Sequence, residues 1–206
     1  MNNLEKSYKK VSTIGEYSKK YFSYLSKVLE SISENEINKL GESLEKSRIN
    51  GNTIFVAGNG GSAATANTMA NDIGFDIIKK TDADKPFRVF SLVDNNSVMT
   101  AISNDVGYEN IFVSQLEIHY RKGDSLIVIS ASGNSSNLVN AANWVKKKGG
   151  IIIGFLGFTG GQLIDLCDVN IHVKANPGEY GPVEDAHLIV NHIISHWFQS
   201  KLKINN

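Results

Sequence analysis

The chain has 206 residues, of which 41% are hydrophobic and 20% are charged, and its formal net charge is zero. A chain of this length and composition can bury a sizeable core as one domain. The balanced charge argues against a protein that binds nucleic acid or an anionic membrane through a basic surface. Cys167 is the only cysteine, so an internal disulfide is excluded and a reducing compartment is expected.

The first ten residues, MNNLEKSYKK, lack the apolar run of a signal peptide, and no stretch approaches the roughly 18 apolar residues that cross a bilayer. We therefore expect a soluble cytoplasmic protein. Apolar residues then recur at helical spacing from Leu4 to Ile32, which predicts one first helix. A second, shorter helix follows and ends at Asn50-Gly51.

The first helix would have roughly 28 residues and a length of about 40 Å, so it would overhang a domain this small. It could lie on its own core as an ordinary amphipathic helix. We favour the other interpretation, in which it packs against a second subunit.

Residues 53–57 are apolar and β-rich, which is typical of a strand buried on both faces of a parallel sheet. Residues 58–62, GNGGS, allow the backbone to turn sharply and to approach a ligand closely. Good helix formers resume over 63–72, with Ser62 expected as the N-cap. A strand, a glycine turn and a helix start direct backbone N–H groups to one point, which predicts an anion site, most simply for phosphate.

Two nucleotide-binding motifs also contain glycine turns of this kind. Gly58, Gly60 and Ala63 fit the loose G-x-G-x-x-[GA] dinucleotide pattern, but the acidic residue expected about 20 positions later is missing, since Asp94 lies further on. A Walker A loop is excluded because no Gly-Lys-Ser/Thr follows the glycines. A nucleotide-cofactor enzyme stays open as a weaker alternative, and the loop taken alone is equally consistent with a plain tight turn.

Further strands and helices alternate along the rest of the chain. The predicted strands cover 87–91, 125–130, 151–155 and 169–173, and the predicted helices cover 96–103, 108–120, 137–148 and 161–167. This alternation predicts an α/β fold, a doubly wound five-stranded parallel sheet flanked by helices. We expect a single domain over 1–206, with a helical segment over 1–50 and the α/β core and last helix over 51–206.

A second loop of the same kind follows the strand at 125–130. Residues 130–136, SASGNSS, carry four hydroxyls and a glycine just before a helix, at the carboxyl end of a strand. Ligands bind beyond these ends in open α/β sheets, and hydroxyls with backbone amides can hold a phosphate. The alternative is a serine-rich turn that only caps its helix. A third polar loop, Ser103-Asn104-Asp105, is equally consistent with a simple turn.

The last helix is predicted from Gly181-Pro182 to about Lys203, with proline at its first position. One apolar stripe is expected to face the core; its members are Val183, Ala186, Val190, Ile193, Ile194 and Trp197. His192 lies nearly opposite the stripe, Glu184 lies toward the same polar side, and His187 is expected at the edge of the core. Solvent exposure of His192 and a helix-dipole role for Glu184 are the simpler alternatives.

With these loops in view, nearly the whole chain resembles the SIS (sugar isomerase) domain family, and within it the phosphoheptose isomerases. The resemblance implies a five-stranded parallel sheet, a homotetramer, active sites at subunit interfaces and a phosphorylated sugar as ligand. It also implies a set of phosphosugar contacts, to which the glycine turn adds Ser62: Asn59, Gly60, Gly61, Ser62, Asn104, Asp105, Ser130, Ser132 and Ser135.

The sequence departs from this family at the catalytic positions. After the glycine loop the family carries a His and, four residues later, a Glu that acts as base and metal ligand; here these positions are Thr68 and Asp72. In the last helix the family's Gln is Glu184, and its catalytic and metal-binding His is retained as His192. Thr is a poor zinc ligand, so a tight zinc site is doubtful, although Asp72, Glu184 and His192 are candidates to hold a divalent metal.

An aldose–ketose isomerisation needs a base at carbon, an acid at the oxygens and a grip on the phosphate. We expect Asp72 to act as the base, His192 to move protons at the oxygens and Glu184 to be the reserve base, with sedoheptulose 7-phosphate as the nearest substrate. Glu184 and His192 lie eight residues apart, about 12 Å along a helix, so one ion cannot bind both from the same helix. The alternative function is a regulatory protein that keeps the phosphate site and has lost the chemistry.

Overall fold

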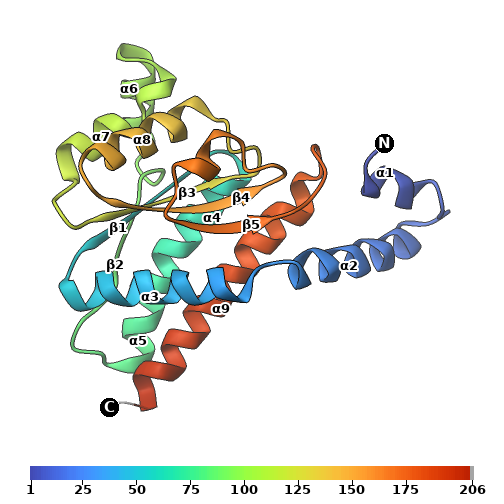
Figure 1. Ribbon diagram of the computed structural model, residues 1–206, viewed down its shortest axis with the longest axis horizontal. Coiled ribbons are helices and arrows are strands. Elements are labelled where there is room, and N and C mark those ends of the chain that lie inside the picture. The colour runs from blue at the N-terminus through green and yellow to red at the C-terminus, as the bar shows by residue number, and fades with distance from the viewer. Residues whose placement is uncertain (205–206) are drawn as a thin grey trace.

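A five-stranded, all-parallel sheet forms the centre of the computed structural model, which describes residues 1–204 (Figure 1). The strand order is β2-β1-β3-β4-β5. The strands are β1 (Thr53–Gly58), β2 (Arg88–Ser91), β3 (Ser125–Ser130), β4 (Ile151–Gly157) and β5 (Val169–Val173). The prediction of a doubly wound α/β fold is confirmed, and the limits predicted for β3 and β5 are correct.

Helices cover both faces of the sheet, with α7 and α8 on one side and α3, α4, α5 and α9 on the other (Figure 1). The helical elements are α1 (Asn3–Tyr8), α2 (Ile14–Glu30), α3 (Glu34–Asn50), α4 (Gly61–Met69), η1 (Ala70–Asp76, a π-helix), α5 (Ile77–Thr81), α6 (Asn96–Asp105), η2 (Tyr108–Asn110), α7 (Val113–His119), α8 (Ser136–Lys147), η3 (Gly161–Asp165) and α9 (Tyr180–Ile204). Within residues 1–204, no helix is both long and apolar enough to cross a membrane.

The burial of each strand follows its place in the sheet. All six residues of β3 are buried, as central strands covered on both faces require. The edge strand β5 alternates between buried and half-buried residues. Its outer edge is partly paired by α3, because the Glu36 carboxylate accepts a hydrogen bond from the backbone N–H of Asn170 at 3.0 Å. The helix thus protects an edge that would otherwise offer free donors to another chain.

The prediction of one helix from Leu4 to Ile32 is wrong, because the chain forms α1 and α2 with a break between them. Thr13 caps α2 by accepting from the N–H of Glu16, which favours a new start there. The N-terminal end of α1 is held by a tertiary contact. Glu179, which is fully buried, accepts from the N–H of Asn3 and from the Tyr24 hydroxyl, both at 2.5 Å. This carboxylate holds α1 beside the turn that precedes α9.

The last helix is longer than predicted and turns a different face to the core. α9 begins at Tyr180, so Pro182 is its third residue rather than its first. Ile193 and Trp197 are 49% and 63% exposed, and the prediction that they belong to the buried stripe is wrong. Ile194 is buried as predicted, and the buried face continues from it through Phe198 and Leu202. Contact with α5 and η1 selects this face, and the apolar pattern alone could not.

His187 lies inside the core rather than at its edge, with 1% of its surface exposed. Its Nε2 lies 3.3 Å from the carbonyl oxygen of Leu156, and its Nδ1 has no hydrogen-bond partner among the described residues. Burial lowers the pKa of His187 to about 4, and nearby His172 acts in the same direction. The imidazole is therefore neutral in the folded protein at neutral pH, with Nε2–H donating to the carbonyl.

This buried imidazole predicts a loss of stability in acid. As the pH falls from about 6.5 to about 4, the unfolded chain binds a proton at His187 and the folded chain does not, so the unfolding free energy decreases by roughly 3 kcal/mol. Denaturant titrations at pH 7.5 and 4.5 should show a smaller decrease for His187→Leu than for the wild type. The exposed His119 provides the control, because His119→Gln should keep the wild-type decrease. Equal decreases in all three proteins would contradict this account.

Candidate functional site

The glycine loop (residues 58–62) and the serine loop (residues 130–136) follow neighbouring parallel strands. β1 and β3 pair directly, and Gly58 is in register with Ile129. The chain leaves β1 toward β2 on one side and continues to β3 on the other, so the two loops meet at the topological switch point of the sheet. Open α/β sheets bind ligands at this point.

The glycine loop places α4 directly at the end of β1. Gly60 has φ +55° and ψ −122°, a conformation that residues with a Cβ rarely adopt, and the helix begins at Gly61. The prediction that Ser62 is the N-cap is therefore wrong. Ser62 lies in the first turn, 5% exposed, and its backbone N–H bonds to the carbonyl of Asn59 at 3.0 Å.

A pair of amides joins the two loops. The side chains of Asn59 and Asn137 exchange two hydrogen bonds of 3.0 Å, one in each direction. Asn137 lies in the first turn of α8 with 1% exposure, and its Oδ1 also accepts from the N–H of Leu138. The Asn59 Oδ1 accepts a further hydrogen bond from the Tyr108 hydroxyl at 2.8 Å. The Asn59 side chain is thus held by protein groups on two sides.

The serine loop is folded by its own hydroxyls. The Ser130 Oγ accepts from the N–H of Gly133 at 3.0 Å, and the Ser132 Oγ accepts from the N–H of Asn134 at 3.3 Å. Ser135 occupies the N-cap position of α8 without a capping hydrogen bond from its side chain. The loop therefore presents a helix start and a hydroxyl that is not used for capping at the carboxyl end of β3.

Asn104 and Asp105 lie apart from these two loops in sequence and in structure. They end α6, a helix with no buried residue, and the amide of Asn104 donates to the carboxylate of Asp105 at 2.7 Å. The link from this segment to the glycine loop is made three residues later, through the hydroxyl of Tyr108 on Asn59.

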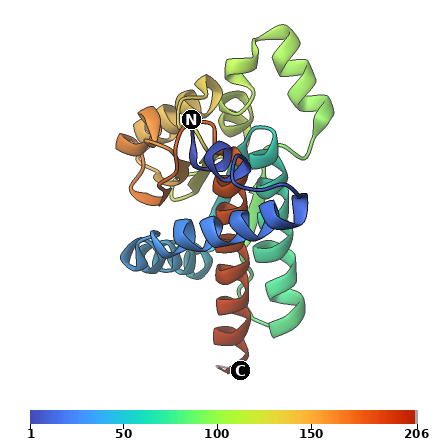
Figure 2. The ribbon, with the colours of Figure 1, turned by 90° about the vertical axis from the view of Figure 1, so that its right-hand side faces the viewer.

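α4, η1 and α5 run alongside α9 in the same direction (Figure 2). The first turns of α9 therefore lie beside the glycine loop, and a later part of α9 lies beside η1. At the loop, the carboxylate of Glu184 fills the space that a Cβ on Gly61 would need. Burial raises the pKa of Glu184, and the neighbouring Asp185 raises it further. Asp185 is itself held by the Tyr21 hydroxyl from α2 at 2.5 Å.

Further along the same helices, Asp72 and His192 form a pair. The His192 Nε2 lies 3.6 Å from the Asp72 Oδ2, with the side chains 53% and 16% exposed, respectively. Asp72 lies within η1, and π-helical turns frequently occur at functional sites. The same carboxylate oxygen accepts from the Asn191 amide at 2.7 Å. The predicted base and proton carrier are thus brought together, and Glu184 is placed elsewhere.

Comparison with known proteins settles the family. A model of the SIS domain matches residues 16–157. The chain belongs to the SIS domain family. It is 41% identical over 146 residues to the phosphoheptose isomerase of Aneurinibacillus thermoaerophilus, and the aligned region covers 70% of this chain and 71% of that protein. It is 35% identical over 178 residues to the phosphoheptose isomerase of Aliarcobacter butzleri, covering 86% and 91%.

The structural comparison agrees with this SIS assignment. Phosphoheptose isomerase GmhA from Neisseria gonorrhoeae superposes with a TM-score of 0.80 at 26% identity, covering 91% of this chain and 100% of that chain. The predicted family resemblance is therefore confirmed. The chain is a SIS protein of the phosphoheptose isomerase type.

The metal site that the SIS resemblance implies does not fit the donors of a single chain. The Thr68 hydroxyl donates back to the carbonyl of Ala64 at 3.0 Å, within its own helix. Glu184 lies against Gly61, whereas His192 lies against Asp72. Among the residues that the structure describes, no three His, Cys, Asp or Glu side chains gather closely enough to hold a metal ion.

Three site residues were not predicted from the sequence: Asn137, Tyr108 and Asn191. Asn137 could have been found, since it opens the helix after the serine loop, where a side-chain amide can reach a neighbouring turn. Tyr108 and Asn191 carry no such signal. Their roles depend on contacts with residues 49 and 119 positions away in sequence.

Proposed function

We propose that this SIS protein interconverts a ketose phosphate and an aldose phosphate through an enediolate, with sedoheptulose 7-phosphate as the substrate. The observation that carries the proposal is the meeting of two phosphate-type loops at the switch point, joined by the Asn59–Asn137 amide pair. The names of the relatives point to the same reaction. A phosphorylated substrate and a single cysteine also fit a cytoplasmic enzyme.

Backbone amides and hydroxyls, rather than cationic side chains, would bind the phosphate. The start of α4 at Gly61 and the start of α8 at Ser136 each present the positive end of a helix dipole. The hydroxyls of Ser130, Ser132 and Ser135 lie on the second loop. We expect Asn59 to contribute mainly through its backbone, since its side chain is held by Asn137 and Tyr108.

The proton chemistry would use Asp72 as the base and His192 as the proton carrier at the sugar oxygens. The two side chains are 3.6 Å apart, and His192 is exposed enough to meet a ligand. Positioned acid–base groups contribute about 10²- to 10⁴-fold to a rate. Glu184 stands at the glycine loop instead, against Gly61, where burial raises the pKa of its carboxyl.

The distance along α4 and η1 supports a site that is shared between two chains. Asp72 is eleven residues from Gly61, about 16 Å along a helix. This separation exceeds the length of an extended seven-carbon sugar. We infer that the Asp72–His192 pair of one chain serves the phosphate loops of a second copy, as expected for sites at subunit interfaces.

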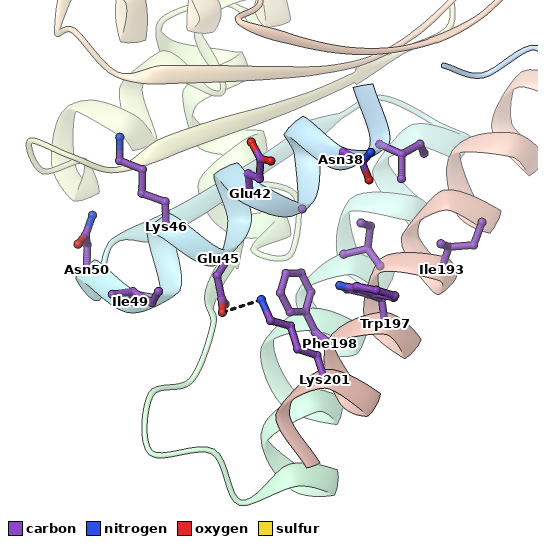
Figure 3. A pocket seen from close by; sticks show the side chains of 13 residues that line it. Asn38, Glu42, Glu45, Lys46, Ile49, Asn50, Ile193, Trp197, Phe198 and Lys201 are labelled. Atoms are coloured by element: carbon purple, nitrogen blue, oxygen red, sulfur yellow. Dashed lines mark hydrogen bonds and ion pairs between the residues drawn. The ribbon is translucent and has the colours of Figure 1, made fainter. Parts of the chain in front are cut away.

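The surface beside His192 suits such a second copy. Ile193 and Trp197 are exposed next to it on α9 and border a groove of about 670 Å³ between α9 and α3 (Figure 3). The rim of the groove carries both signs of charge, from Glu42, Glu45, Lys46 and Lys201. A patch with an apolar centre and mixed charges can pair with itself around a two-fold axis.

A second apolar groove, of about 1000 Å³, lies between α1 and α2, where Tyr8 and Ile14 are 71% and 86% exposed. Two separate apolar faces favour two different two-fold contacts, and two such contacts generate a tetramer. We therefore propose a homotetramer.

The proposal is tested by incubating purified protein with sedoheptulose 7-phosphate and following formation of the aldose phosphate by NMR. The expected result is turnover that rises in proportion to protein concentration. Thermal stabilisation by the phosphosugar without turnover would reject the enzyme and support the regulatory alternative, which the internal hydrogen bond of Thr68 favours. If the protein neither bound the phosphosugar nor converted it, both functions would be rejected.

A shared site predicts complementation between two defective chains. Asp72→Asn lacks the base, and Asn59→Ala lacks the amide that joins the two loops, so each homomer should have little activity. Mixed oligomers made by co-expression should regain activity, because some sites combine the intact loops of one chain with the intact base of another. A mixture of separately assembled homomers is the control. Mixed oligomers no more active than that control would show that each site belongs to one chain.

A further inference from the structure

Three polar side chains recur every four residues along α9, on the face that packs against η1 and α5. They are Asn191, Ser195 and Gln199, with exposures of 0%, 4% and 9%. Their surroundings are apolar; the buried neighbours on these helices include Ile73, Ile77, Ile194 and Phe198. A buried polar group costs free energy unless it is hydrogen-bonded, so three in one helix contact call for a reason.

Their hydrogen bonds converge on Asp72. The Asn191 amide donates to the Asp72 carboxylate at 2.7 Å, and the Ser195 hydroxyl donates to the Asp72 backbone carbonyl at 3.0 Å. The amide of Gln199 in turn donates to the Ser195 Oγ at 3.0 Å. One helix therefore holds both the side chain and the backbone of a single residue on the other.

The carboxylate is fixed at both oxygens. Oδ2 accepts from Asn191 and faces His192, whereas Oδ1 accepts from the amide of Asn71 at 3.0 Å. The contact to the backbone lies inside the π-helical segment Ala70–Asp76, and Ser195 is one of the groups that hold this segment in place. Two amides from two helices thus set the orientation of the carboxylate, and the Ser195 hydroxyl holds the backbone that carries it.

Stability does not account for Asn191. Its Oδ1 is buried and has no hydrogen-bond partner among the described residues, which is a cost that the native fold carries. A leucine has the same number of side-chain heavy atoms and would carry no unpaired amide oxygen. The amide is therefore better explained by what it does to Asp72 than by packing.

We propose that Asn191 and Ser195 are positioning residues, which hold the Asp72 carboxylate in the orientation that faces His192. This inference rests on the proposed function, in which Asp72 is the base. It adds that the base works only while α9 fixes it, since a misplacement of about 1 Å can cost roughly 100-fold in rate. Neither residue is expected to touch the substrate.

The kinetic test compares Asn191→Leu and Ser195→Ala with the wild type, using sedoheptulose 7-phosphate. We expect kcat to fall about 10- to 100-fold in Asn191→Leu and less in Ser195→Ala. KM should stay within about twofold, because the phosphate loops are unchanged. A purely structural role would lower the amount of folded protein without lowering kcat per folded enzyme.

Matched controls separate positioning from the general loss of a buried polar group. Ser47 is 8% exposed and donates to the carbonyl of Ser43 at 3.0 Å, the same chemistry and distance as Ser195 on Asp72. Gln115 is a 3% exposed amide that donates to two carbonyls away from Asp72. Ser47→Ala and Gln115→Leu should leave kcat within about twofold of the wild type.

Crystal structures of the wild type and of Asn191→Leu provide a readout that does not depend on activity. We expect the Asp72 carboxylate to rotate away from His192 in the variant. An unmoved carboxylate, or a fall in kcat no larger than that of Gln115→Leu, would overturn the proposal. If the wild type proves inactive, the proposed function fails while the crystal structures still decide the positioning. If Asn191→Leu does not fold, the same measurements on Ser195→Ala decide it.

Discussion

Replacing Asp72 with Asn should reduce kcat on sedoheptulose 7-phosphate by about 10³-fold, because the base at carbon is lost. The substitution keeps the shape of the side chain and an oxygen that can accept from Asn191, so the fold should be retained. Phosphosugar binding should persist, since the glycine and serine loops that are proposed to hold the phosphate are unchanged. Steady-state kinetics and thermal stabilisation by the phosphosugar measure the two effects separately.

Asp76 offers a matched control on the same π-helix, four residues further along. Its carboxylate pairs with Lys80 at 3.1 Å near the surface, a type of contact that contributes little to stability. Asp76→Asn should therefore keep kcat within about twofold of the wild type. If Asp72→Asn kept more than about a tenth of the wild-type kcat, the base would lie elsewhere, and Glu184 would be the next candidate.

Gly133→Ala should damage both stability and phosphosugar binding. Gly133 has φ +67°, and a Cβ there would overlap the carbonyl oxygen of Gly160, on the loop that follows β4. Left-handed backbone costs a residue with a Cβ about 1–2 kcal/mol, and overpacking adds about 1–3 kcal/mol. The unfolding free energy should fall by about 3 kcal/mol. Phosphosugar affinity should fall about 10- to 100-fold as the serine loop is displaced, since hydrogen bonds to a charged group contribute about 1.5–3 kcal/mol each.

Gly149 provides a control that separates the cost of the left-handed backbone from the cost of the overlap with Gly160. It has φ +73°, almost the same backbone conformation, and no atom of residues 1–204 lies within 4 Å of the position of a Cβ. Gly149→Ala should cost only about 1–2 kcal/mol and leave binding unchanged. Denaturant unfolding and calorimetric titration with the phosphosugar make the comparison. Equal losses in both variants would mean that the serine loop does not depend on its close approach to Gly160.

Local patterns in the sequence were sufficient for the sheet and for the two loops. The strand limits of β3 and β5 were predicted correctly because buried central strands and alternating edge strands leave a signal within five or six residues. Parallel strands place their carboxyl ends on one edge, so the glycine and serine loops were also expected on the same side of the sheet. Both inferences require only neighbours in sequence.

Other features were mispredicted or missed because distant residues decide them. The break between α1 and α2 depends on Glu179, which bonds Asn3 from 176 positions away. The exposed face of α9 depends on contact with α5 and η1, which turns Ile193 and Trp197 outward. Periodicity specifies that a helix is amphipathic, but a shift of one residue changes which side is buried.

The sequence by itself determined the α/β class, the parallel sheet and the two loops, because these follow from backbone propensities and short apolar patterns. Only the tertiary structure decided how the acid–base groups are arranged, with Asp72 beside His192 and Glu184 at the glycine loop. The physical reason is that α4 and α9 are far apart in the chain. Their register is set by the side chains that pack between them, and a one-dimensional pattern carries no information on that register.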